Sequence, residues 1–167
     1  MLALANEHTK DLMKEVEETN ALDICRKAIA AMPEVDPQRV KVELEDKTEG
    51  HSKKLTTNSD SLLQMLGNIL ENSVKFTDDG HIRLTLSKDK NYFHFTIADT
   101  GCGIPSDKIG TIFNRFTKVD EFKEGLGLGL AYCHETVSKL GGTLVLDQTS
   151  TAGTTFILSL PIKLKTK

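Results

Sequence analysis

The chain has 167 residues, of which 38% are hydrophobic and 27% charged, a balance typical of a globular domain with a real core. Its net charge of −3 gives no electrostatic indication of a nucleic-acid partner. Cys25, Cys102 and Cys133 are scattered, which indicates neither a zinc site nor a disulfide framework and fits a reducing compartment. No apolar run approaches the roughly 20 residues of a membrane helix, and the N-terminus lacks a signal-peptide pattern.

In chain order, the first half of the sequence predicts two helices, two strands and a longer helix, over residues 2–19, 23–32, 40–44, 55–57 and 61–77. The second half predicts two strands, a helix and two final strands, over 81–87, 92–99, 128–140, 143–147 and 154–160. Asp79-Gly80 suggests the start of a hairpin, and residues 101–127 are irregular and rich in glycine and charge. Together these elements predict an α/β sandwich in which helices cover one face of a single sheet.

The helix predicted over 61–77 carries a polar stripe. Asn68, Asn72 and Lys75 are spaced four and three apart, so they stack on one side of the helix, with Glu71 beside them and Phe76 on the apolar flank. Amide oxygens can ligate a hard cation such as Mg²⁺, and a lysine can meet a phosphate. A surface helix with chance polar residues is the alternative, and the stripe alone does not decide between the two.

The stretch DTGCGIP follows an apolar strand and begins with Asp99. A partly desolvated carboxylate at a strand end can accept a hydrogen bond from an exocyclic amine. Gly101 and Gly103 let the backbone pass close to a flat ligand and adopt positive φ, and Pro105 fixes the exit. A simple turn or N-cap aspartate is the alternative, which this stretch taken alone favours.

The stretch EGLGLGL places Gly125, Gly127 and Gly129 before the helix predicted over 128–140. Free amides at a helix N-terminus form an anion site, although the spacing matches neither a P-loop nor a dinucleotide-binding fingerprint. A flexible linker into the helix would give the same pattern.

The stretch IFNRFTKV places Phe113 and Phe116 as apolar anchors in a charged region. Arg115 between them could reach a phosphate with its planar fork. A small hydrophobic plug with an exposed arginine is the alternative.

The order NILENSVKFT, DTGCGIP, IFNRF, EGLGLGL resembles the N, G1, F and G2 boxes of the catalytic, ATP-binding domain of sensor histidine kinases. The resemblance covers about residues 20–160. The wider superfamily, which includes the ATP-binding domain of gyrase B, generally lacks the phenylalanine box. The resemblance implies the Bergerat ATP-binding fold, which is an α/β two-layer sandwich. Its sheet is mixed but mostly antiparallel, its helices pack on one face, and a mobile ATP lid, here over 118–124, covers the site.

The resemblance also implies ATP and Mg²⁺ as cofactors. Asn72 would ligate the Mg²⁺ that bridges the ATP phosphates, with Asn68 and Glu71 nearby. Lys75 would contact phosphate, and Phe76 would line the nucleotide pocket. Ser73 stands where a small alanine is often found.

For the base, the resemblance implies that Asp99 accepts a hydrogen bond from the adenine N6 amine. Gly101, Gly103 and Ile104 would pack by the base, and Thr154 would support the adenine site through water. Arg115 would approach the γ-phosphate as the lid closes and, with Lys75, would act in catalysis. The residues implied to hinge the lid and to present amides to the phosphates are Gly125, Leu126, Gly127, Leu128 and Gly129.

The implied reaction is in-line transfer of the ATP γ-phosphate to a histidine on a dimerisation domain. None of the five histidines fits the acceptor pattern, so the chain resembles a catalytic domain cut from a larger kinase, with little turnover alone. Residues 1–19 would be the end of the dimerisation helix or a linker, and 20–167 the catalytic domain.

The implied partners are the phosphoacceptor domain of the same kinase and a downstream response-regulator receiver domain, with no nucleic acid. The fragment would be monomeric and cytoplasmic, either free or as the cytoplasmic part of a membrane-anchored sensor. Two alternatives stay open: a non-catalytic nucleotide-gated interaction module, and an anti-sigma-type serine kinase of the same fold.

Overall fold

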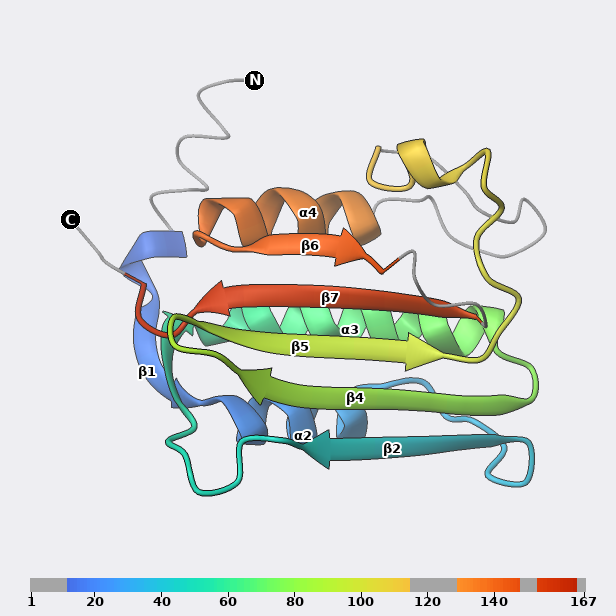
Figure 1. The fold of residues 1–167 in the computed structure, drawn as a ribbon, viewed down its shortest axis with the longest axis horizontal. Coiled ribbons are helices and arrows are strands. Elements are labelled where there is room, and N and C mark those ends of the chain that lie inside the picture. The colour runs from blue at the N-terminus through green and yellow to red at the C-terminus, as the bar shows by residue number, and fades with distance from the viewer. Residues whose placement is uncertain (1–11, 115–128, 148–152, 165–167) are drawn as a thin grey trace.

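The fold is a five-stranded sheet with helices on one face, as the computed structural model in Figure 1 shows. The structure describes residues 12–114, 129–147 and 153–164. The strand order is β2-β4-β5-β7-β6, in which β2 and β4 are parallel and the other neighbours antiparallel. The sheet strands are β2 (Val40–Asp46), β4 (Gly80–Lys88), β5 (Tyr92–Asp99), β6 (Thr143–Leu146) and β7 (Thr154–Pro161). The helices are α2 (Ala21–Ala31), α3 (Ser59–Phe76) and α4 (Gly129–Lys139), with a short 3-10 turn at Ile109–Thr111.

The core lies between α3 and the middle of the sheet. Every second residue of β4 and β5 is buried, because successive strand side chains point to opposite faces. The side chains that meet there are fully buried or nearly so: Ile82, Leu84, Leu86, Phe93, Phe95 and Ile97 from the sheet, and Leu62, Met65, Leu66, Ile69 and Leu70 from α3. The predicted two-layer sandwich with a mixed, mostly antiparallel sheet is therefore confirmed.

A separate two-stranded sheet corrects the prediction of a helix over 2–19. β1 (Val16–Asn20) pairs antiparallel with β3 (Lys54–Asn58), so the helical prediction is wrong for residues 16–19. The backbone partners of β1 lie far along the chain, and pairing with them outweighs a weak amphipathic pattern. The buried Leu12 also packs in the core, and a domain boundary at residue 20 stays a prediction.

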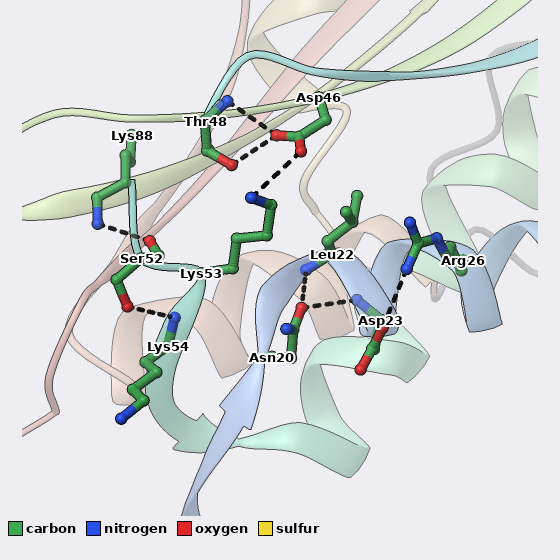
Figure 2. Close-up of polar contacts among 10 residues, drawn as sticks. All are labelled: Asn20, Leu22, Asp23, Arg26, Asp46, Thr48, Ser52, Lys53, Lys54 and Lys88. Atoms are coloured by element: carbon green, nitrogen blue, oxygen red, sulfur yellow. Dashed lines mark hydrogen bonds and ion pairs between the residues drawn. The ribbon is translucent and has the colours of Figure 1, made fainter. Parts of the chain in front are cut away.

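The junction between β1 and α2 is fixed by side-chain hydrogen bonds (Figure 2). The Asn20 side chain accepts from the backbone N–H groups of Leu22, at 2.9 Å, and Asp23, at 3.1 Å. This cap satisfies two of the amides that a helix start leaves unpaired. The strand therefore ends where α2 begins.

The loop between β2 and β3 is closed by Asp46, as Figure 2 also shows. Its carboxylate accepts from the Thr48 backbone N–H at 2.8 Å and from the Thr48 hydroxyl, and it pairs with Lys53 Nζ at 3.5 Å. Lys88 Nζ donates to the Ser52 carbonyl at 2.8 Å from the other side. These polar groups therefore bond to one another within the fold, and no ligand is needed to explain their presence.

The turn at Asp79-Gly80 is real, but it does not start a hairpin. It joins α3 to β4, and Gly80 pairs with Val40 of the parallel strand β2. Asp79 also accepts from the Arg39 guanidinium at 3.0 and 3.1 Å, which ties the turn to the start of β2. The dipeptide predicts a turn correctly. The strand with which β4 pairs is determined by the arrangement of the whole sheet.

Gly67 offers a stability prediction for α3. It lies inside the helix, and a Cβ added there would meet nothing within 4 Å. Gly67→Ala is therefore expected to raise the free energy of unfolding by about 0.5–1 kcal/mol, because alanine loses less backbone freedom on folding. Chemical denaturation measures this change, and a decrease would show that the position is more crowded than the geometry indicates.

Candidate functional site

The end of α3, the end of β5 and the start of β7 meet at one end of the sheet, on the right of Figure 1. Asp99, the last residue of β5, is 5% exposed and pairs in register with Thr154, the first residue of β7. Asp99 Oδ1 accepts from the backbone N–H groups of Gly101, at 3.0 Å, and Thr154, at 3.2 Å. The carboxylate is thus held in the fold by residues far apart in the sequence.

The electrostatics of Asp99 are set by burial and hydrogen bonds. Burial raises the pKa of Asp99 above its ordinary value because it penalises the charged form. Hydrogen bonds from Gly101, from the Ser73 side chain and from Thr154 oppose that rise. The result is a buried, hydrogen-bonded carboxyl group that can accept from a further polar donor.

The loop after Asp99 runs against the C-terminal end of α3. A Cβ on Gly101 would lie 2.1 Å from the Phe76 carbonyl oxygen, and Cys102 N–H donates to that same oxygen at 3.1 Å. Gly103 has φ of +75°, where glycine is favoured, and Ile104 packs against the core. In the structure, the close approach at Gly101 is to the protein's own backbone, which differs from the predicted reason of contact with a ligand.

The polar stripe of α3 lies beside the first turn of α4. Asn68 is half-buried, its Nδ2 is 3.9 Å from Cys133 Sγ, and its Cβ lies 3.6 Å from a Cβ built on Gly129. Burial raises the pKa of the Cys133 thiol to about 12, so the thiol is neutral. Asn72, one turn further along α3, is half-buried.

The remaining members of the stripe form an ion pair. Lys75 Nζ is 3.3 Å from Glu71 Oε1, four residues earlier on the helix, and the Glu71 side chain is exposed. Across 12–114, 129–147 and 153–164, no three His, Cys, Asp or Glu side chains are grouped to hold a metal ion. Two amides and one carboxylate are hard oxygen donors, a set that suits Mg²⁺ when substrate phosphates supply further oxygens.

Comparison with known proteins identifies the family in which this arrangement of α3, β5 and β7 occurs. Residues 57–164 match the family described as histidine kinase-, DNA gyrase B-, and HSP90-like ATPase. The chain belongs to this family. The match contains α3 with its stripe, the loop after Asp99, and the start of β7.

Sensor histidine kinases are among the curated relatives of the chain. The sensor histidine kinase RcsC of Escherichia coli strain K12 is 35% identical over 105 residues, which cover 60% of this chain and 11% of that protein. The sensor histidine kinase WalK of Bacillus subtilis is 32% identical over 111 residues, which cover 62% of this chain and 18% of that protein. The chain thus spans less than a fifth of the length of these relatives.

Solved structures share the fold of this chain. The mycobacterial sensor histidine kinase MprB has a TM-score of 0.74 at 24% identity, over 90% of this chain and 99% of that chain. ShkA, solved full-length in complex with AMPPNP, has a TM-score of 0.77 at 25% identity, over 91% of this chain and 32% of that chain. The first comparison shows the fold alone, and the second protein was solved together with an ATP analogue.

Several residues that were predicted to belong to the nucleotide site lie outside the described residues. They are Arg115, Gly125, Leu126, Gly127 and Leu128, together with Phe116 and the lid over 118–124. Phe113 is described, and its ring stacks on His134 of α4 at 4.7 Å and meets Phe156 edge-on at 6.2 Å. That ring is therefore an apolar anchor, as predicted.

Two groups at the site were not predicted from the sequence. The Thr154 backbone N–H donates to Asp99, a contact that the sequence did not predict, and the support of adenine through water that the resemblance implies for Thr154 stays a prediction. Ser73 lowers the pKa of Asp99 and is buried on the apolar face of α3, one turn after Ile69. A polar residue at an apolar helix position is the signal that could have identified Ser73.

In the described residues, no helix is both long and apolar enough to cross a membrane.

Proposed function

We propose that this chain is the catalytic domain of a two-component sensor histidine kinase, which binds MgATP and transfers its γ-phosphate to a histidine on a dimerisation domain. Asp99 carries the proposal. It is a buried acceptor at a strand end, and adenine offers an N6 amine donor where guanine offers an O6 acceptor. A carboxylate in this place would therefore select adenine and disfavour guanine.

Separate sets of residues would bind the base and the phosphates of ATP. Gly101, Gly103 and Ile104 would border the adenine beside Asp99, and Thr154 would support it. Asn72, with Asn68 and Glu71, would hold Mg²⁺ against the ATP phosphates, and Mg²⁺ would neutralise charge during transfer.

On the phosphate side, Phe76 would line the pocket between base and phosphates. Lys75 would exchange its ion pair with Glu71 for a contact to phosphate. Arg115 would stabilise the transferring γ-phosphate, and the stretch from Gly125 to Gly129 would donate amides to the phosphates. In this scheme the chain positions ATP and balances its charge, while the acceptor histidine and its base come from the partner domain.

The proposed partners are the phosphoacceptor domain of the same kinase and a receiver domain that takes the phosphate onward. Residues 20–167 would form the catalytic domain, and 1–19 would connect it to the dimerisation helices. Because ATP is the proposed substrate, we place the domain in the cytoplasm.

Calorimetry with ADP, AMPPNP and GDP, with and without Mg²⁺, tests the binding step. The chain is expected to bind the adenine nucleotides, to gain affinity for AMPPNP from Mg²⁺, and to bind GDP far more weakly. Asn72→Ala is expected to remove most of the Mg²⁺-dependent gain, about tenfold or more, because a ligand of the cation is lost. Gln64→Ala is the matched control, since Gln64 lies two turns earlier on the same side of α3 and is assigned no role.

Transfer is tested by incubating the chain and labelled ATP with a dimerisation domain that bears the acceptor histidine. Acid-labile phosphate on that domain is expected. Acid-stable phosphate would instead identify a serine kinase. Nucleotide binding without any transfer would favour the nucleotide-gated interaction module, and absence of nucleotide binding would overturn the proposal.

A further inference from the structure

Cys133 of α4 makes two hydrogen bonds with α3, the helix that carries the polar stripe. Its side chain is fully buried. Cys133 Sγ donates to the backbone carbonyl oxygen of Met65 at 3.5 Å, and Asn68 Nδ2 donates to Cys133 Sγ at 3.9 Å. Sulfur is larger than oxygen, so hydrogen bonds to it are longer. One buried thiol therefore joins the backbone of α3 to the first asparagine of the stripe.

The contact with Met65 decides which end of the Asn68 amide faces the sulfur. A carbonyl oxygen can only accept, so the single thiol proton points at Met65. The lone pairs of the sulfur then face Asn68, and they can accept from the Nδ2 hydrogens but cannot pair with the Oδ1 oxygen. Because both ends of the amide are attached to one planar carbon, Oδ1 is turned away from Cys133.

Packing alone would not fix this orientation of Asn68. The oxygen and nitrogen ends of an amide have nearly the same size and shape, so a purely apolar neighbour would accept either of them. The two ends differ in chemistry, however. An amide oxygen ligates a hard cation, whereas the NH₂ group presents positive hydrogens that repel one. Asn68 is half-buried and lies one turn before Asn72 on the stripe, so its orientation decides which of these groups the site receives.

We propose that Cys133 is a positioning residue for Asn68, and that it holds the amide with Oδ1 turned toward the Mg²⁺ that accompanies the ATP phosphates. The inference rests on the proposed function. Because Cys133 is fully buried, it would touch neither Mg²⁺ nor phosphate and would act through Asn68.

The test compares three substitutions of buried cysteines. Cys133→Val keeps an apolar side chain of similar size but removes both hydrogen bonds. Cys133→Ser keeps one proton and its lone pairs, so a hydroxyl there can donate to Met65 and accept from Asn68. Cys25→Val is the matched control, because Cys25 is also fully buried but lies on α2 and is assigned no role in the site.

Two measurements are made on each variant. Proton–nitrogen NMR of the nucleotide-free chain gives the hydrogen exchange rate of the Asn68 side-chain amide, whose signal is assigned by its loss in Asn68→Ala. Calorimetry gives the affinity for AMPPNP with and without Mg²⁺. The first measurement reports the hydrogen bond to the sulfur, and the second reports what the orientation of the amide does for the cation.

Cys133→Val is expected to speed exchange of the Asn68 amide about fivefold and to reduce the Mg²⁺-dependent gain in affinity about fivefold, with Mg²⁺-free affinity unchanged. Cys133→Ser is expected to restore most of both quantities, and Cys25→Val to change neither. Unchanged amide exchange in Cys133→Val would overturn the inference. Equal losses of affinity with and without Mg²⁺ would also overturn it, because they would indicate a role in packing alone.

The NMR measurement separates this inference from the proposed function. If exchange of the Asn68 amide responds as expected but the unmodified chain binds no AMPPNP, the link between Cys133 and Asn68 stands. The proposed function then fails, and with it the role of Oδ1 toward Mg²⁺.

Discussion

Asp99→Asn is expected to weaken ADP binding by about 100-fold while leaving the fold intact. The asparagine oxygen can still accept from Gly101 N–H and Thr154 N–H, as Asp99 Oδ1 does now. The amide nitrogen would then replace Oδ2, the oxygen that is proposed to accept from adenine. Because the adenine N6 group is itself a donor, the two would repel where the carboxylate attracts.

The stability of the Asp99→Asn variant separates a local effect from unfolding. Burial raises the pKa of Asp99 in the folded chain, so its stabilising contribution is present below the unfolded-state pKa and is lost as pH rises through the folded-state pKa. Asparagine does not ionise and escapes this loss. The variant is therefore expected to unfold at the same temperature as the unmodified chain or higher near pH ~8, and to lose that advantage near pH ~3.

Asp89→Asn is the matched control for Asp99→Asn. Asp89 lies in the turn between β4 and β5, at the other end of both strands, and bonds to His94 Nε2 at 2.7 Å. That contact, together with hydrogen bonds from the backbone N–H groups of Asn91 and Tyr92, lowers the pKa of Asp89 to about 2. Its loss is expected to leave ADP affinity unchanged. Calorimetry that finds equal affinity in Asp99→Asn and the unmodified chain would remove Asp99 from the site.

The elements around the site could be predicted because their signals are local. α3 has strong apolar periodicity and an N-cap asparagine, Asn58, whose side chain accepts from Ser61 N–H at 2.9 Å. β5 alternates cleanly between buried and half-exposed residues. β1 had no such signal, since VEETN is equally compatible with the end of a helix and its strand partner lies about forty residues later.

The candidate site could be proposed from the sequence where side chains would carry the chemistry. The asparagines of α3 and the carboxylate of Asp99 could be chosen by residue type and spacing, and their roles stay predictions. Backbone donors have no such signature, and the Thr154 N–H group reaches Asp99 across 55 residues of sequence. The reason for Gly101 was likewise hidden, because the carbonyl of Phe76 that excludes a side chain belongs to another element.

Gly153→Ala is expected to cause the largest loss of stability, about 3 kcal/mol or more, together with loss of nucleotide binding. Gly153 has φ of +67°, and a Cβ there would lie 1.9 Å from the Asp99 carbonyl oxygen and 2.7 Å from its carbonyl carbon. Both obstacles are backbone atoms of the strand end, which cannot turn aside as a flexible side chain can. Relief requires β5 and β7 to separate where Thr154 N–H donates to Asp99.

Gly50→Ala separates the two causes of the stability loss in Gly153→Ala, which are the positive φ and the collision of the new Cβ with β5. Gly50 has φ of +77°, but a Cβ there would meet nothing within 4 Å, so only the conformational cost of about 1–2 kcal/mol applies. Urea denaturation of both variants gives the difference, which measures the collision with β5. A similar loss of stability in both variants would mean that β5 and β7 move apart at Gly153 with little cost in free energy. Asp99 would then not be held rigidly enough for its hydrogen bonds to select a base. A large difference, accompanied by loss of ADP binding only in Gly153→Ala, would tie the recognition of the base to the backbone of β7.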